Sequence, residues 1–254
     1  MDHYATSPAD RIPVHQKVVY GLGAFVNNLL AAASGGMMIV LNLGLGMNPA
    51  LVGLLGALPR LTDAFTDPIM GYISDNTRTR WGRRRPYIFA GAIASGVTFA
   101  LLWSLPEGHS ETFYFWYFLI GSIVFYLAYT VFATPWVALG YELTPDYHER
   151  TRLMGVQNFM GQLAYVVAPW FLLFMQNEAI FDDMVEGAAG LAYIIAILVI
   201  AVGVLPALFL KERFRDLAVA EGREHRTAET GSALMRNLAG FFRGCAVTLR
   251  SKPF

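Results

Sequence analysis

The sequence predicts an all-α membrane protein in which six helices cross the bilayer as one bundle. Of its 254 residues, 55% are hydrophobic and only 15% are charged, whereas about a quarter of the residues of a soluble domain are charged. Apolar runs long enough to cross a membrane, about 20 residues each, recur six times. Apart from Arg60, which lies within the second run, the basic residues lie in alternate loops and in the two terminal segments. The single cysteine excludes a disulfide framework within the chain.

The expected helices follow the apolar runs in chain order. Residues 1–16 are polar, and the first run, about 18–45, is much longer than the 7–15 residues of a signal-peptide core, so we expect a helix that is retained. The second and third helices are expected at about 50–76 and 87–105. The fourth is expected at about 113–141, with a break or kink at Pro135. The last two are expected at about 153–176 and 188–210.

The distribution of basic residues predicts the orientation in the membrane. Two Lys or Arg residues precede the first helix, five lie after the second, two after the fourth and nine after the sixth, while the other loops contain acidic residues and no basic ones. Because cytoplasmic loops are enriched in Lys and Arg, both ends of the chain are expected in the cytoplasm. This orientation suits an integral protein of the plasma (inner) membrane.

Three segments are therefore expected. Residues 1–16 would form a cytoplasmic N-terminus and residues 17–210 the six-helix transmembrane bundle. Residues 211–254 would form a cytoplasmic linker, in which Leu234, Leu238 and Phe241 recur at helical spacing between arginines. This pattern predicts an amphipathic helix, which lies either on the membrane surface or against protein. The chain ends as if entering a seventh helix, so we expect it to cover only the first half of a larger protein.

Three charged residues share one face of the second helix. Arg60, Asp63 and Asp67 follow the spacing i, i+3, i+7, which places them on one side of a helix with the two carboxylates a turn apart. Charges in a bilayer are costly and usually functional. Two such carboxylates repel each other, so either one binds a proton or a cation lies between them. This predicts a site for Na⁺, Li⁺ or H⁺, with Thr66 and Thr130 as further oxygen ligands. The alternative is a structural salt bridge with Arg60.

A longer pattern surrounds these charges. Arg60-x-x-Asp63-Ala-x-x-Asp67-Pro-x-x-Gly71, followed by Asp75 and Arg80-Trp-Gly-Arg-Arg-Arg-Pro86, resembles the signature of the glycoside–pentoside–hexuronide:cation symporters. These are the melibiose-permease-like branch of the major facilitator superfamily. The resemblance extends over about residues 15–215. It implies that the chain is the N-terminal half of a 12-helix major facilitator fold, with a C-terminal six-helix half as its partner.

The resemblance also implies roles for individual residues. The family's cation site matches Asp63, Asp67 and Thr130, with Thr66 between the acids. The positions that grip galactosides in melibiose permeases fall instead on Asn28, Ala133 and Asn158. The family's cytoplasmic gate, in which an acid pairs with arginines, matches one set of residues: Gly71, Asp75, Arg80, Arg83, Arg84 and Arg85. A simpler interpretation of the arginines is that they set orientation and contact anionic lipid.

A substrate cavity can be predicted from polar side chains within the helices. Amides and a phenol suit sugar hydroxyls, although each could equally form a hydrogen bond between helices. The candidates are Asn27, Asn28, Tyr126, Asn158 and Gln162.

These observations predict a cation-coupled secondary symporter of a sugar or glycoside that works by alternating access. One alternative is symport of an amphipathic lipid such as a lysophospholipid. Another is a receptor or assembly module that does not transport. An enzyme is not expected, because the sequence has no metal-ligand spacing, P-loop, G-x-S-x-G or dinucleotide loop. We expect no cofactor, no transition metal and no nucleic-acid partner. The expected partners are the substrate, the lipid bilayer and the C-terminal half.

Overall fold

The computed structural model describes residues 6–106 and 108–212, which form helices joined by turns. The amphipathic helix expected within residues 211–254 lies almost entirely outside the described residues. A short 3₁₀ helix (Pro8–Asp10) precedes the first α-helix. The α-helices are α1 (Val14–Gly36), α2 (Ile39–Leu43), α3 (Pro49–Ala57), α4 (Arg60–Asn76), α5 (Arg85–Trp103), α6 (Glu111–Glu142), α7 (Tyr147–Val167), α8 (Trp170–Met175) and α9 (Met184–Phe209).

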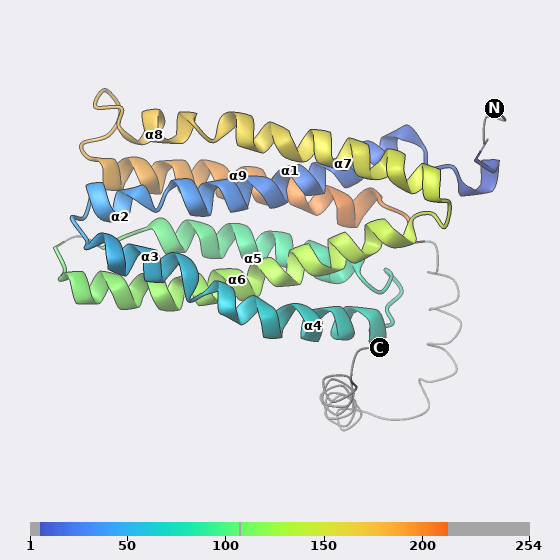
Figure 1. Ribbon diagram of the computed structural model, residues 1–254, viewed down its shortest axis with the longest axis horizontal. Coiled ribbons are helices and arrows are strands. Elements are labelled where there is room, and N and C mark those ends of the chain that lie inside the picture. The colour runs from blue at the N-terminus through green and yellow to red at the C-terminus, as the bar shows by residue number, and fades with distance from the viewer. Residues whose placement is uncertain (1–5, 107, 213–254) are drawn as a thin grey trace, which may run out of the picture.

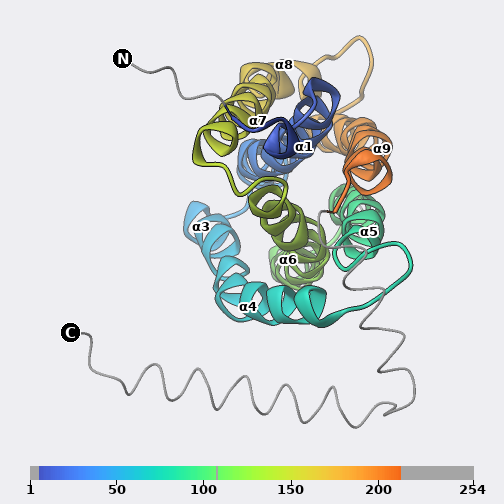
Figure 2. The ribbon, with the colours of Figure 1, turned by 90° about the vertical axis from the view of Figure 1, so that its right-hand side faces the viewer.

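The helices run roughly along one axis and form a single bundle (Figure 1). Seen from its end, α1 lies beside α7 and α9, α5 lies between α6 and α9, and α4 packs on α6 (Figure 2). The loop between α4 and α5, the loop between α6 and α7 and the end of α9 lie at one end of the bundle (Figure 1). Chain direction therefore alternates, as the predicted topology requires, and the predicted all-α fold class is confirmed.

Within residues 6–106 and 108–212, five helical segments are long and apolar enough to cross a membrane: Val14–Leu43, Arg85–Trp103, Glu111–Glu142, Tyr147–Met175 and Met184–Phe209. The second predicted helix, 50–76, is not one of them. It is divided into α3 and α4, and α4 has only 17 residues, four of them charged. Together α3 and α4 still run along the bundle beside α6 (Figures 1 and 2).

Three predicted helices are interrupted. Turns at residues 37–38, 58–59 and 168–169 separate α1 from α2, α3 from α4, and α7 from α8. Pro59 and Pro169 occupy two of these turns, because proline lacks the amide proton that a continuing helix needs. Pro135 behaves differently: α6 continues through it without a break.

Helices α1, α7 and α9 begin four or more residues earlier than predicted, and the first turns of α1 and α7 contain charged side chains. Helix α1 begins at Val14 instead of 18, and α7 begins at Tyr147 instead of 153. The charged side chains in their first turns are paired: Lys17 Nζ lies 2.6 Å from Glu149 Oε1, and Glu149 is only 1% exposed. Because these charges neutralise each other, residues that resemble a loop in the sequence form helix in the structure.

Close helix packing in the core depends on glycine. A Cβ atom on Gly91 of α5 would lie 2.4 Å from the backbone nitrogen of Phe132 in α6. A Cβ atom on Gly23 of α1 would lie 2.2 Å from Trp136 Nε1. Trp136 stacks on Tyr20 with 5.0 Å between ring centroids. The core therefore joins α1, α5 and α6 tightly, which fixes the face of α6 that meets α4.

Candidate functional site

Both carboxylates of the predicted cation site open into one cavity between α1, α4 and α6. The cavity has a volume of about 480 Å³. Asp63 and Asp67 line it from α4, because a spacing of four residues places them on the same helix face. Its other lining residues are Asn27, Tyr129, Thr130, Ala133, Thr134, Val137, Ala138 and Tyr141.

Asp67 is held by two hydroxyl groups of α6. Thr130 Oγ1 donates to Asp67 Oδ1 at 2.9 Å, and Thr134 Oγ1 donates to the same oxygen at 3.2 Å. Thr66 Oγ1 lies 3.5 Å from Thr130 Oγ1. Thr66 and Thr130 are among the ligands predicted from the sequence, whereas Thr134 is not, although its i+4 spacing from Thr130 places it on the same face of α6. Four oxygen-bearing side chains therefore meet at this point.

Asp63 retains a free oxygen. Its Oδ1 is buried and has no hydrogen-bond partner among the residues that the structure describes. Arg60, the first residue of α4, lies with Cζ 5.9 Å from the ring centroid of Tyr126. Arg60, Asp63 and Tyr126 together line a smaller cavity of about 100 Å³. The predicted charge partner is therefore beside Asp63, while the oxygen of Asp63 remains able to accept a proton or contact a cation.

A polar chain extends from the carboxylates toward α1. The Tyr129 hydroxyl donates to Asn27 Oδ1 at 2.7 Å, and Asn27 Nδ2 donates to Asn28 Oδ1 at 3.3 Å. Asn28 packs against Gly161 of α7, where an added Cβ would lie 2.6 Å from Asn28 Nδ2. Of these two predicted substrate residues, Asn27 lines the carboxylate cavity and Asn28 lies at the contact between α1 and α7.

The other predicted substrate residues lie elsewhere. Tyr126 faces Arg60 and lines the smaller cavity. Asn158 and Gln162 are exposed on α7, one turn apart, with 3.5 Å between Gln162 Nε2 and Asn158 Oδ1. Neither lines the carboxylate cavity. The described residues therefore do not bring all five predicted side chains into one cavity.

The predicted cytoplasmic gate contains an ion-pair cluster, which we call the latch: Asp75, Arg83, Arg84 and Glu142. Arg84 Nε donates to Asp75 Oδ1 at 3.0 Å, and Arg84 Nη2 lies 3.1 Å from Glu142 Oε1. Arg83 Nη2 donates to the same Glu142 oxygen at 2.6 Å. The latch joins the end of α4 to the end of α6. Glu142 is not among the gate residues predicted from the sequence, because it lies 58 residues or more from its partners along the chain.

The remaining gate residues have different surroundings. The Arg85 side chain donates to the carbonyl oxygens of Ala207 and Leu208 at the end of α9. Gly71 faces α6, where an added Cβ would lie 3.8 Å from Thr134 Cγ2. Arg80 is exposed.

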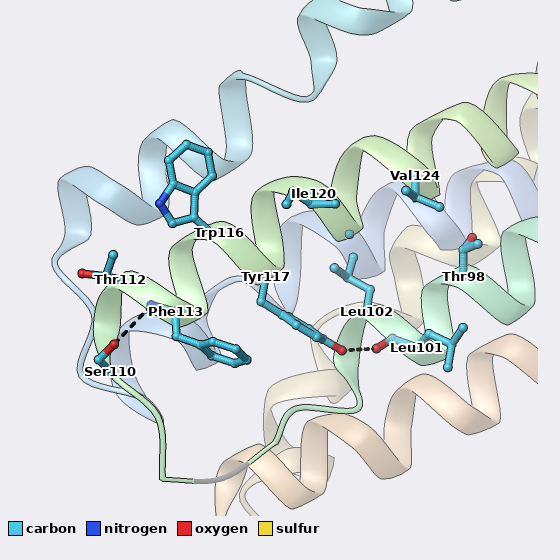
Figure 3. Close-up of a pocket in the computed structure, with 11 residues that line it drawn as sticks. Thr98, Leu101, Leu102, Ser110, Thr112, Phe113, Trp116, Tyr117, Ile120 and Val124 are labelled. Atoms are coloured by element: carbon cyan, nitrogen blue, oxygen red, sulfur yellow. Dashed lines mark hydrogen bonds between the residues drawn. The ribbon is translucent and has the colours of Figure 1, made fainter.

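A larger cavity lies on the outer side of α5 and α6 and is unrelated to these charges. It has a volume of about 580 Å³ and no charged residue in its lining. Figure 3 shows Trp116, Ile120 and Val124 along α6 facing this groove, with the Tyr117 hydroxyl bonded to the Leu101 carbonyl at 2.7 Å. An apolar groove on a membrane helix needs no specific polar ligand. We therefore place the candidate site at the cavity that Asp63 and Asp67 both line.

With the fold and the polar cavity described, comparison with known proteins identifies the family. The model of the MFS/sugar transport protein family matches residues 16–243. The chain belongs to this family. Its members are membrane transporters and not enzymes, and the resemblance to glycoside–pentoside–hexuronide:cation symporters is confirmed.

Individual relatives agree with this assignment. The chain is 31% identical over 171 residues to the isoprimeverose transporter of Lactiplantibacillus pentosus, covering 64% of this chain and 35% of the relative. It is 32% identical over 143 residues to the inner membrane symporter YicJ of Escherichia coli, covering 56% and 31%. An uncharacterized symporter of Synechocystis, sll1374, is 28% identical over 229 residues, covering 87% and 41%. The chain thus matches about a third to two fifths of the length of these relatives.

Proposed function

We propose that this chain forms the N-terminal six-helix half of a cation-coupled symporter for a sugar or glycoside. The observation that carries the proposal is the shared cavity, in which Asp63 and Asp67 lie beside Asn27 and Tyr129. A cation and a polar substrate in this cavity would be neighbours. Binding of one would therefore change the affinity for the other, which is the energetic requirement of coupled transport.

The cation ligands would be oxygen atoms. The free oxygen of Asp63, the carboxylate of Asp67 and the hydroxyls of Thr66 and Thr130 form a set that suits a hard cation such as Na⁺ or Li⁺. The same two carboxylates could instead share one proton, because like charges this close are not both stable without a counterion. Both versions depend on Asp63 and Asp67, and they differ in whether substrate binding depends on Na⁺ or on pH.

The substrate would occupy the remainder of the cavity. Asn27 and Thr134 offer hydrogen-bonding groups, and Tyr129 and Tyr141 offer aromatic surface, a combination that suits sugar hydroxyls and rings. The volume of about 480 Å³ lies in the usual range for small-molecule sites. The name of one relative, the isoprimeverose transporter of Lactiplantibacillus pentosus, supports the same class of substrate.

Transport would then follow alternating access. We propose that a second six-helix bundle packs over the carboxylate face and that one bundle rocks against the other. Both ends of the chain would lie on the cytoplasmic side of the inner membrane, because the basic loops gather at one end of the bundle. The latch would hold that end closed while the cavity opens outward.

The experiment measures binding of a panel of sugars, glycosides and lysophospholipids to the full-length protein, with and without Na⁺, at two pH values. We expect sugar binding that depends on Na⁺ or on pH, and we expect Asp63→Asn and Asp67→Asn to abolish that dependence. Glu178→Gln is the matched control, because it alters an exposed acid in the loop between α8 and α9, away from the carboxylate cavity. Binding of lysophospholipid alone would replace the sugar proposal. Ion-independent binding, with loss of folding in both Asp variants, would support a receptor or assembly module.

The latch needs a separate test. Asp75→Asn removes the carboxylate that Arg84 binds, so we expect the inward-open state to gain population. A fluorescence-transfer pair across the cytoplasmic ends of the two halves reports this change. Unchanged transport kinetics together with an unchanged distance distribution would refute a latch role and leave only orientation as the function of the arginines.

A further inference from the structure

Glu212 is buried against the loop between α4 and α5, although it lies beyond the end of α9, the last helix that the structure describes. Helix α9 ends at Phe209, and Glu212 is only 8% exposed. Its carboxylate accepts three backbone hydrogen bonds: Oε2 from the nitrogen of Arg83 at 2.8 Å, and Oε1 from the nitrogens of Arg84 and Arg85 at 2.9 and 3.1 Å. Three consecutive peptide groups therefore point at one carboxylate.

These three peptide groups form the start of α5. The first N–H groups of a helix have no partner within the helix and attract negative charge. In α5 the N-cap residue, Arg84, provides no capping hydrogen bond from its side chain. Glu212 supplies the cap from more than 120 residues away in the sequence. Gly82 makes room for it: its φ is +120°, and a Cβ there would lie 2.5 Å from Glu212 Oε2.

The same three residues send their side chains to three different helices. Arg83 bonds Glu142 of α6, Arg84 bonds Asp75 of α4, and Arg85 bonds the last carbonyl groups of α9. A side chain can reach its partner only from the backbone position that carries it. Glu212 fixes all three backbone positions at once, so it sets the geometry of the latch without contacting its acidic partners.

We propose that Glu212 is the positioning residue of the gate and connects the segment that follows α9 to the latch. The inference rests on the proposed function, in which that segment leads to the second bundle. When the second bundle rocks, the displacement of the chain after α9 reaches Glu212 first. The three hydrogen bonds pass it to Arg83 and Arg84, which loosen their hold on Glu142 and Asp75. Gate opening is then driven by the linker as well as by the cavity.

The test uses the full-length protein in which every native cysteine, Cys245 included, is replaced by Ser, and Ala138→Cys places a reporter thiol in the lining of the cavity on α6. Inside-out vesicles are treated with a membrane-impermeant thiol reagent, and the labelling rate reports opening at the latch end. Glu212→Gln exchanges an acceptor oxygen for an NH₂ group that meets backbone N–H groups. Loss of one charge-assisted hydrogen bond shifts an equilibrium by about tenfold or more. We therefore expect about tenfold faster labelling.

Two controls distinguish positioning of the latch by Glu212 from a general effect of Glu212 on stability. Glu149→Gln alters another buried carboxylate, which binds the backbone nitrogen of Ile12 at the same end of the bundle but outside the latch. It should lower the melting temperature without faster labelling. The double variant Glu212→Gln/Asp75→Asn should label no faster than the faster single variant, because both changes act through Arg84.

The outcomes are distinct. If Asp75→Asn accelerates labelling and Glu212→Gln does not, the inference about Glu212 is wrong and the latch remains. If neither variant accelerates labelling, the latch itself fails. The proposal is overturned if the two single-variant increases in labelling rate multiply in the double variant. It is also overturned if Glu149→Gln accelerates labelling as much as Glu212→Gln, because Glu212 then acts only on general stability.

Discussion

Replacing Thr130 by valine keeps the shape of the side chain and removes the hydroxyl that meets Asp67. Thr130 is 3% exposed, and its Oγ1 lies 2.9 Å from Asp67 Oδ1. A buried hydrogen bond to a charged group contributes about 1.5–3 kcal/mol. If Oγ1 turns from Asp67 to a bound cation, valine removes a ligand of similar strength. Na⁺ affinity should therefore fall by roughly ten- to a hundredfold in Thr130→Val.

The comparison with Thr134 sharpens this prediction. Thr134 is only half-buried, and its hydrogen bond to Asp67 is exposed and longer, at 3.2 Å, so water can replace its hydroxyl. We expect Thr134→Val to weaken Na⁺ binding by less than about fivefold, equivalent to about 1 kcal/mol. Thr130→Ser keeps the oxygen and should restore most of the affinity. Thr98→Val is the control, because the Thr98 hydroxyl bonds Ala94 of its own helix on the side of the outer groove.

Isothermal titration calorimetry of Na⁺ into the detergent-solubilised full-length protein gives the affinities directly. Thr130→Val should lose the most Na⁺ affinity and Thr134→Val the next most, while Thr130→Ser and Thr98→Val should lose the least. The reasoning fails if Thr130→Val binds Na⁺ as tightly as the control, or if Thr134→Val is the more damaging change. If no variant and no wild-type sample binds Na⁺ while pH controls substrate binding, the coupling ion is the proton.

Three further predictions concern packing and assembly. Lys17→Met leaves the buried Glu149 without its 2.6 Å partner and should lower unfolding stability by up to about 3 kcal/mol; a melting temperature equal to that of wild type would contradict this. Gly91→Ala places a Cβ atom 2.4 Å from the backbone of Phe132 and should cost about 1–3 kcal/mol, whereas Gly53→Ala, with open space around it, should not; similar thermal melting curves for both variants would count against close packing of α5 on α6. Residues 1–254 alone, reconstituted in liposomes, should show no cation-driven sugar uptake, and measurable uptake would disprove the need for a second bundle.

Interactions within one helix were predictable from the sequence. Asp63 and Asp67 face one cavity because helical periodicity fixes their relative direction. The charge partner Arg60 follows from the same periodicity. Thr134 could have been found by the same rule, since it lies one turn after Thr130 on α6.

Contacts between distant segments were not predictable. Glu142 and Glu212 look like ordinary charges at the ends of apolar helices, and their arginine partners lie about 60 and 130 residues away. Nothing in the neighbouring sequence marks Glu212 as buried or Glu142 as paired with arginines. Asn158 and Gln162 show the opposite error: their polar character suggested a cavity, but the rotation of α7 is set by its packing on α1 at Gly161. That rotation leaves both side chains exposed on this half.

The break at Leu58–Pro59 divides the second predicted helix into two unequal pieces, α3 and α4. Helix α4 carries the carboxylates, and its contacts with α6 keep them in place. Helix α3 buries only Leu55 among its nine residues, and segments with few buried contacts open at low cost. Helix α3 can therefore swing on the break as a short flap while Asp63 and Asp67 stay in place against α6. Amide hydrogen exchange should be faster in α3 than in α4, and substrate should slow exchange in α3 if the flap closes over it.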